Sequence, residues 1–115
     1  MSQLNQDQVL EIYKSIGALL EGHFILSSGL HSRMYLQSAS VFSDSKIGEK
    51  LCVSLANMVR HEINIEDIDV IVSPAMGGVI VGYELSRHLE KRNIFAERKD
   101  GEFRIRRGFD IIKGQ

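Results

Sequence analysis

The spacing of apolar residues along the chain predicts three amphipathic helices, at residues 5–21, 44–62 and 78–91. In each segment apolar side chains recur every three or four positions, which places them on one helical face. Shorter apolar runs have the length of strands, and these are residues 24–26, 34–36, 69–72 and 94–96. Residues 102–107 alternate like a further strand with one charged face. The pattern as a whole predicts an α/β fold.

Local signals mark where the predicted helices begin and end. Asn5 and Gln8 are spaced as in a capping box at the start of the first helix. Gly22 is placed to end that helix. Ser43 or Asp44 can cap the second helix.

The stretch at residues 69–82 organises the rest of the chain. Its apolar strand stops at Ser73-Pro74, and a turn of small residues with Gly77 and Gly78 leads into the third helix. The loop of such a unit lies at the carboxyl end of the strand, where open α/β sheets bind their ligands. Glycine lets the backbone approach a ligand closely, and the free N–H groups of a helix start favour an anion. We therefore expect an anion at this loop.

The last apolar strand follows the third helix closely, which predicts a parallel βαβ unit with a right-handed crossover. The two strand ends then lie side by side, so Arg98 and Lys99 are expected to face the same crevice as the glycine pair. Asp100-Gly101 is a strong signal for a tight turn. Five of the fourteen basic residues lie within 98–107. Anion binding and an ordinary solvated strand face both remain open for them.

The hairpin predicted around the runs 24–26 and 34–36 has a polar loop. Its small and polar residues are Ser27, Ser28, Gly29, His31 and Ser32. Serine and glycine are ordinary turn residues, and His31 is expected to be a solvent-exposed loop histidine. By itself the hairpin is a weak functional signal.

Length, charge and cysteine content narrow the class of protein. A chain of 115 residues, 43% hydrophobic and 25% charged, is expected to form one soluble globular domain. A net charge of −1 gives no reason to expect nucleic acid or a membrane as partner, and no apolar run could span a bilayer. The lone Cys52 excludes an internal disulfide, fits a reducing compartment and falls on an apolar helix face. We expect a cytoplasmic protein with Cys52 buried.

Two parallel strands and their helices do not close a core, because a parallel sheet needs several strands and cover on both faces. We therefore expect a partner chain or a further C-terminal half.

In sequence order, these stretches resemble orotate phosphoribosyltransferases. Residues 22–37 are similar to the N-terminal hairpin of that family, and residues 69–82 to its strand and diphosphate-contacting loop. Residues 95–101 and 106–109 resemble the next strand and the flexible catalytic loop. Four motifs in order with similar spacing make the resemblance specific, and it covers the chain from about residue 17 to the last residue.

The resemblance implies a type I phosphoribosyltransferase fold, with a parallel sheet flanked by helices. Residues 1–42 would form a hood of one helix and a β-hairpin, and residues 43–115 would begin the α/β core of the same single domain. The implied reaction transfers phosphoribosyl from phosphoribosyl diphosphate to orotate, giving orotidine 5′-monophosphate and diphosphate in de novo pyrimidine (UMP) biosynthesis. The resemblance also implies Mg²⁺ as cofactor and a homodimer.

The resemblance carries over site residues one by one. Tyr35 and Leu36 would bind orotate, largely through the backbone. Arg98 and Lys99 would be the catalytic pair that reaches the diphosphate. The positions implied for phosphoribosyl diphosphate are Ser27, Met76, Gly77, Arg98 and Lys99, with Gly78 as a further candidate. Ser27 and Gly77 stand where many members have lysine, and Arg104 or Arg106 is a candidate replacement for further loop residues of the family.

The family's 5′-phosphate signature, an acidic pair followed by a Thr-rich loop, is not among these 115 residues. We therefore expect the chain to correspond to the N-terminal part of such an enzyme and to have little or no activity alone. Two alternatives stay open: a non-catalytic half-domain that dimerises, and a phosphoribosyltransferase for another base. A dinucleotide-binding oxidoreductase is disfavoured, because no G-x-G-x-x-G turn follows the strand.

Overall fold

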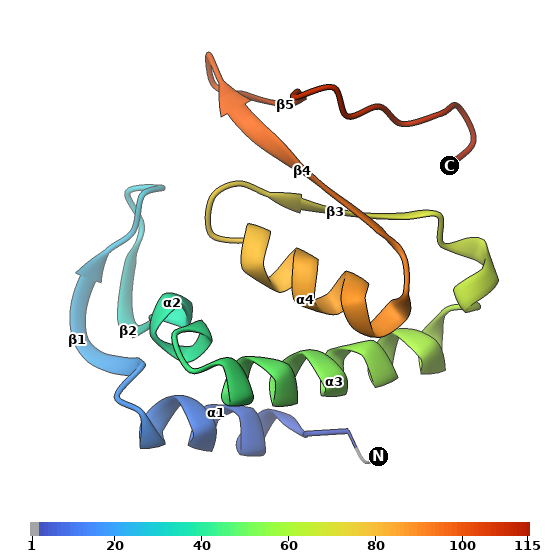
Figure 1. Cartoon of the computed structure of the whole chain (residues 1–115). Coiled ribbons are helices and arrows are strands. Elements are labelled where there is room, and N and C mark those ends of the chain that lie inside the picture. The colour runs from blue at the N-terminus through green and yellow to red at the C-terminus, as the bar shows by residue number, and fades with distance from the viewer. Residues whose placement is uncertain (1–2) are drawn as a thin grey trace. The chain divides into compact units, whose positions relative to one another are not determined.

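The computed structural model describes residues 3–115 as two compact units, Leu4–Gly48 and Glu49–Gln115, with Gln3 assigned to the second (Figure 1). The division falls within helix α3 (Ser45–Glu62). Each unit has its own sheet, so the mixed α/β class predicted from the sequence is confirmed.

The first unit begins with α1 (Gln6–Ser15), whose start is fixed by a capping box. Asn5 Oδ1 accepts a hydrogen bond from the N–H of Gln8, and Gln8 Oε1 accepts one from the N–H of Asn5, both at 2.8 Å. Each side chain therefore satisfies a backbone donor that the helix leaves free. The predicted capping box is confirmed.

Helix α1 ends at Ser15, so the predicted end at Gly22 is wrong. Gly17 has a φ of +72°, a conformation that glycine adopts without strain. The N–H groups of Gly17 and Ala18 donate back to carbonyls in the last turn of the helix, at 3.1 and 2.8 Å. This Schellman motif stops the helix six residues before the end that the apolar pattern suggests.

Strands β1 (Leu19–Ile25) and β2 (His31–Leu36) form the predicted antiparallel hairpin. Leu20 pairs with Tyr35, but beyond Glu21 the register shifts, and Ile25 then pairs with His31. The shift adds one residue to β1, as in a β-bulge. His31 is exposed as expected, but it is the first residue of β2 rather than a loop residue.

A short helix that the sequence did not predict, α2 (Ser38–Phe42), follows the hairpin. It buries Val41, and its Ser38 Oγ lies 2.8 Å from the hydroxyl of Tyr13 on α1. Asp44 then caps α3, since its Oδ1 accepts from the N–H groups of the two residues after Ser45, at 3.0 and 3.2 Å. Of the two predicted caps, Asp44 is the one used.

The second unit holds a three-stranded sheet in the order β3-β4-β5, built from β3 (Val70–Pro74), β4 (Arg92–Lys99) and β5 (Glu102–Ile105). A 3-10 turn, η1 (Ile65–Asp67), precedes β3. β3 and β4 are parallel and are joined by α4 (Val79–Leu89), which runs back beside them (Figure 1). The predicted βαβ unit is confirmed.

β5 returns antiparallel to β4 through a two-residue turn. Asp100 and Gly101 both have positive φ, +53° and +81°, as a type I′ turn requires. The predicted tight turn is confirmed, but the strand after it ends at Ile105 instead of residue 107.

The core of the second unit is small and, among the described residues, contains three buried serines beside its apolar residues. Its buried residues include Cys52, Ala56, Leu89 and Ile94, so the prediction of a buried cysteine is confirmed. Within residues 3–115, no helix combines the length and the apolar character needed to cross a membrane.

Candidate functional site

The loop at residues 75–78 lies at the carboxyl end of β3 and leads directly into α4. The N–H of Ala75 donates to the carbonyl of Ala96 on β4 at 2.7 Å, which fixes the start of the loop beside that strand. The Ala75–Met76 peptide is cis. Among the described residues, the N–H groups of Met76 and Gly77 have no acceptor. Two free donors at a helix start are well suited to an anion.

Access to this loop is open, and its glycines differ in their roles. Met76 is 86% exposed, and a Cβ on Gly77 would meet nothing within 4 Å. A Cβ on Gly78 would lie 2.7 Å from Pro74 Cδ and 2.8 Å from the Pro74 carbonyl oxygen. Glycine is therefore required at 78 to let the chain fold back onto Pro74, whereas at 77 it leaves room for a ligand.

Arg98 and Lys99 end β4 at the same edge of the sheet, two and three residues beyond Ala96. The guanidinium of Arg98 lies 4.7 Å from the ring centroid of Phe103, its partner across the β4–β5 ladder. Within the described part of the chain, the ammonium of Lys99 has no ion-pair partner. Successive strand residues point to opposite faces, so the two cations stand on the two faces of the sheet edge.

Glu97 forms ion pairs with two of the other basic residues of this segment. Its carboxylate accepts from Arg106 Nη1 at 3.3 Å and forms a shorter contact with Arg107 Nε. The hydrogen bond from Arg107 lowers the pKa of Glu97 below its ordinary value. Arg104 has a longer, exposed contact with Glu102 at 3.4 Å. Of the five basic residues at 98–107, Arg98 and Lys99 are therefore the two that have no carboxylate partner among residues 3–115.

The remaining predicted site residues, Ser27, Tyr35 and Leu36, belong to the first unit. Ser27 is exposed in the turn closed by the hydrogen bond from Leu26 N–H to Leu30 O (2.8 Å). Tyr35 and Leu36 end β2 at the opposite end of the hairpin and are also largely exposed. At about 3.3 Å per strand residue, roughly 15 Å separates the two ends. Ser27 therefore cannot contact the same ligand atoms as Tyr35 and Leu36.

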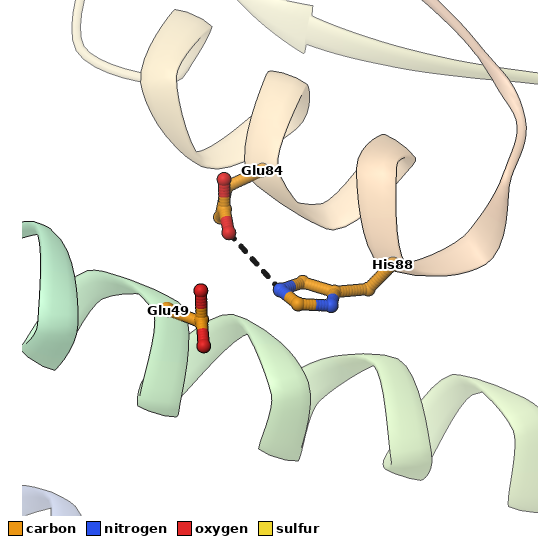
Figure 2. Close-up of side chains that lie close together, drawn as sticks. All are labelled: Glu49, Glu84 and His88. Carbon is orange, nitrogen blue, oxygen red and sulfur yellow. Dashed lines mark hydrogen bonds and ion pairs between the residues drawn. The ribbon is translucent and has the colours of Figure 1, made fainter.

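A polar cluster that the sequence reasoning missed joins α3 to α4. Figure 2 shows Glu84 and His88 on α4 opposite Glu49 on α3. One carboxylate oxygen of each glutamate and a ring nitrogen of His88 lie within 4.8 Å of one another. Glu84 Oε1 lies 3.0 Å from His88 Nε2, and Arg87 donates to Glu84 at 2.6 Å and to Glu49 at 3.1 Å. The hydrogen bond from Arg87 lowers the pKa of Glu84.

This cluster is an ion-pair network rather than a metal centre. The guanidinium of Arg87 already pairs with both carboxylates, and it would repel a metal cation placed between them. Arg87 and His88 lie in the last turn of α4, where positive charge also complements the helix dipole. The spacing of Glu84 and His88, four residues apart on one helix face, is the signal that could have found the network.

Comparison with known proteins gives the chain clear relatives, although no protein-family model matches it. It is 49% identical over 110 residues to the orotate phosphoribosyltransferase of Maricaulis maris, covering 96% of this chain and 56% of that protein. It is 53% identical over 106 residues to the orotate phosphoribosyltransferase of Campylobacter jejuni, covering 91% of this chain and 51% of that protein. The chain spans about half the length of the curated relatives it matches.

Solved structures agree on the fold. The crystal structure of orotate phosphoribosyltransferase from Aeropyrum pernix superposes with a TM-score of 0.65 at 20% identity, over 84% of this chain and 56% of that one. Leishmania donovani UMP synthase gives a TM-score of 0.64 at 18% identity, over 86% of this chain and 23% of that one. By sequence over nearly its whole length, and by fold, the chain is a homologue of the orotate phosphoribosyltransferases that corresponds to about half of such a protein.

Proposed function

We propose that the chain forms the diphosphate-contacting and base-contacting portion of an orotate phosphoribosyltransferase. The complete enzyme would transfer phosphoribosyl from phosphoribosyl diphosphate to orotate in de novo pyrimidine biosynthesis. The observation that carries the proposal is the loop at 75–78, where two N–H groups without acceptors stand at the start of α4, at the sheet edge that also bears Arg98 and Lys99. The names of the curated relatives support it.

The geometry suits a reaction in which diphosphate leaves. The bond between the ribose C1 and the diphosphate oxygen breaks while a ring nitrogen of orotate forms a bond to C1. Negative charge then grows on the diphosphate, so donors aimed at it stabilise the transition state more than the bound substrate. We assign this role to the N–H groups of Met76 and Gly77 and to the cations of Arg98 and Lys99.

We propose that the β1–β2 hairpin contributes the residues that contact the base. We assign orotate to the backbone of Tyr35 and Leu36, and the phosphoribosyl diphosphate to Ser27. Ser27 and Gly77 carry no charge, so the cationic contribution of this chain falls on Arg98 and Lys99. In this assignment residues 1–42 are the hood and residues 43–115 the beginning of the core.

We propose Mg²⁺ as the cofactor, bound by the diphosphate oxygens rather than by this chain. Magnesium prefers carboxylate, phosphate and water oxygens. At this sheet edge, among the described residues, Glu97 and Glu102 are engaged by arginines. The one remaining carboxylate there, Asp100, is exposed in the β4–β5 turn, and a single carboxylate does not make a magnesium site. The roles assigned to this loop and strand end belong to backbone N–H groups and cationic side chains.

Titration calorimetry of the chain with inorganic diphosphate and with phosphoribosyl diphosphate, with and without Mg²⁺, tests the proposal. A charge-assisted hydrogen bond contributes about 1.5–3 kcal/mol, so Lys99→Gln should weaken binding by about 10-fold to 100-fold. Lys91→Gln, directly before β4 and so at the opposite end of that strand from Lys99, is the matched control, and we expect it to change binding less than twofold. If both variants lost the same affinity for diphosphate, the loss would come from the change in net charge, and this would contradict the role assigned to Lys99.

The same samples separate the alternatives. Dimers that bind neither diphosphate nor orotate would favour the non-catalytic interaction module. We propose that the complete enzyme is a cytoplasmic homodimer, and light scattering of the complete protein checks the dimer. Turnover of the complete protein with orotate, compared with uracil and adenine, tests the choice of base.

A further inference from the structure

We propose that His23 and His31 form a transition-metal site on the β1–β2 hairpin. The site takes a borderline divalent ion of the Zn²⁺ class and is separate from the magnesium chemistry proposed above. His23 Nε2 and His31 Nδ1 lie 2.5 Å apart, and the two ring centroids are 4.7 Å apart at a tilt of 39°. Two ring nitrogens therefore converge on one point.

The register of the hairpin explains the convergence. After the bulge, toward the turn of the hairpin, Phe24 pairs with Ser32 and Ile25 pairs with His31. Continuing this register back by one residue places His23 opposite Arg33. His31 is then the diagonal neighbour of His23 on the same face of the hairpin, within reach of long side chains. The pairing depends on the extra residue in β1, because without it the two histidines would fall on opposite faces.

The surroundings leave the pair accessible. Both histidines are exposed and line one hollow of about 840 Å³, together with Glu21 and Arg33 among others. Among the described residues, the facing ring nitrogens have no hydrogen-bond partner except each other. Glu21 lines the same hollow, but its carboxylate is not within 4.8 Å of both ring nitrogens and would become a third ligand only after its side chain turns, so water fills the remaining positions. The positive charge of Arg33 opposes a cation, so the site is expected to be open and exchangeable.

The coordination step needs only a small rearrangement. In the neutral pair, one ring donates its N–H to the lone pair of the other. For both facing nitrogens to bind a metal, the donor ring must carry its proton on its other nitrogen, so neutral rings release no net proton. Metal–nitrogen bonds of about 2.0–2.1 Å at a tetrahedral angle place the nitrogens about 3.3 Å apart. Two exposed rings can open by the missing fraction of an ångström.

The choice of metal follows from the ligands. Imidazole nitrogen suits zinc, copper and nickel, whereas magnesium selects oxygen. Two histidines with an optional carboxylate leave open coordination positions, as in exchangeable zinc sites. A bound ion would cross-link β1 to β2 next to the turn at 26–30. We therefore expect the ion to restrict the motion of the hairpin and to leave the loop at residues 75–78 unchanged.

Zinc titration of the metal-free chain by calorimetry, in the presence of excess Mg²⁺, tests the site. The chain contains four histidines, so His61→Gln and His88→Gln are matched controls for His23→Gln and His31→Gln. We expect one zinc equivalent for the unchanged chain, at least tenfold weaker binding in either hairpin variant, and unchanged binding in both controls. Affinity should fall as the pH is lowered, because the ligand must be neutral imidazole.

Nickel titration followed by NMR tests the same site in the unchanged chain, so the result does not depend on whether a variant folds. In the unchanged chain, paramagnetic Ni²⁺ should broaden the ring signals of His23 and His31 before those of His61 and His88. Broadening of all four rings together, or zinc binding that survives both hairpin substitutions, would overturn the proposal. Loss of zinc binding in His88→Gln alone would place the ion at the α3–α4 network instead and would also overturn it.

Discussion

The contact of α4 with β3 at Gly82 leads to a sharp prediction for the substitution Gly82→Ala. A Cβ at this position would lie 2.5 Å from Ser73 Oγ, 2.9 Å from Ser73 Cβ and 3.2 Å from Asn93 Oδ1. Ser73 is buried on β3, so its Cβ cannot move without its strand. On the helix side, Ser86 Oγ donates to the Gly82 carbonyl within α4 at 2.7 Å. The added methyl group must therefore separate helix and sheet.

Two effects of opposite sign set the magnitude. Alanine favours a helix interior over glycine by about 1 kcal/mol. Overpacking a well-filled interior costs about 1–3 kcal/mol, and here the upper part of that range applies because a Cβ–Cβ contact has no rotamer that relieves it. We expect a net loss of about 1–2 kcal/mol in the free energy of unfolding. This is a large share of the roughly 5–15 kcal/mol that is typical of a folded domain.

Urea denaturation followed by circular dichroism measures the loss, and Ser73→Ala turns it into a double-mutant cycle. Ser73 Oγ is buried without a hydrogen-bond partner among the described residues, so Ser73→Ala alone should be neutral or stabilising. In its background Gly82→Ala should cost less, because the 2.5 Å contact is gone. Gly77→Ala, with no atom within 4 Å of its Cβ, is the control. A Gly82→Ala chain as stable as the original, or coupling below about 0.5 kcal/mol, would refute the reasoning.

Three further predictions concern the cap of α1, the ion-pair network and the thiol. Asn5→Ala should cost about 1 kcal/mol, seen as a thermal midpoint lower by several degrees, and an unchanged midpoint would mean that the capping box contributes nothing. Because Arg87 lowers the pKa of Glu84 from its ordinary 4.5, the pair stabilises the fold above that pH and loses its effect as the pH falls through the lowered pKa. Glu84→Gln should flatten this part of the acid dependence of the urea midpoint, and an identical pH profile would contradict the pairing. Burial, followed by the charge of Glu84, raises the pKa of Cys52 to about 11, so Ellman's reagent at pH 8 should modify it only on unfolding; rapid reaction of the native protein would contradict this.

The features that the sequence predicted well are those whose causes are local. The capping box at Asn5 and the turn at Asp100-Gly101 depend on the conformational preferences of a few neighbouring residues. The βαβ unit follows from a short apolar strand on each side of an amphipathic helix, because only a crossover joins two parallel strands.

The sequence predicted some element boundaries wrongly because two local patterns overlap there or because the element is too short to show a pattern. Leu19 and Leu20 continue the helical spacing of α1, but Gly17 ends the helix and the two leucines open β1. Helix α2 is five residues long, too short to show a period. Strand β5 stops at Ile105 because Arg107 and Gly108 take positive φ and turn the chain onto Glu97.

The sequence predicted which elements lie at the candidate site, but it did not predict which side chains contact one another there. The strand–loop–helix order at residues 69–82 was sufficient to predict a loop at the strand end beside Arg98 and Lys99, and anion binding there stays a prediction. The pairing of His23 with His31 was not visible, because it depends on a one-residue bulge that changes which residues share a face. Similarly, the use of Arg107 by Glu97 depends on how the segment after β5 folds back.

The stacking of Arg98 on Phe103 gives the proposed diphosphate site a built-in spectroscopic reporter. Protons held over the face of an aromatic ring are shielded by its ring current, so the side-chain protons of Arg98 should resonate upfield of their usual positions. An anion that draws the guanidinium away from the ring would return those signals downfield. A fluorine label on Phe103 would sense the same movement from the other side of the ladder. The free and occupied states of Arg98 thus become distinguishable without any turnover.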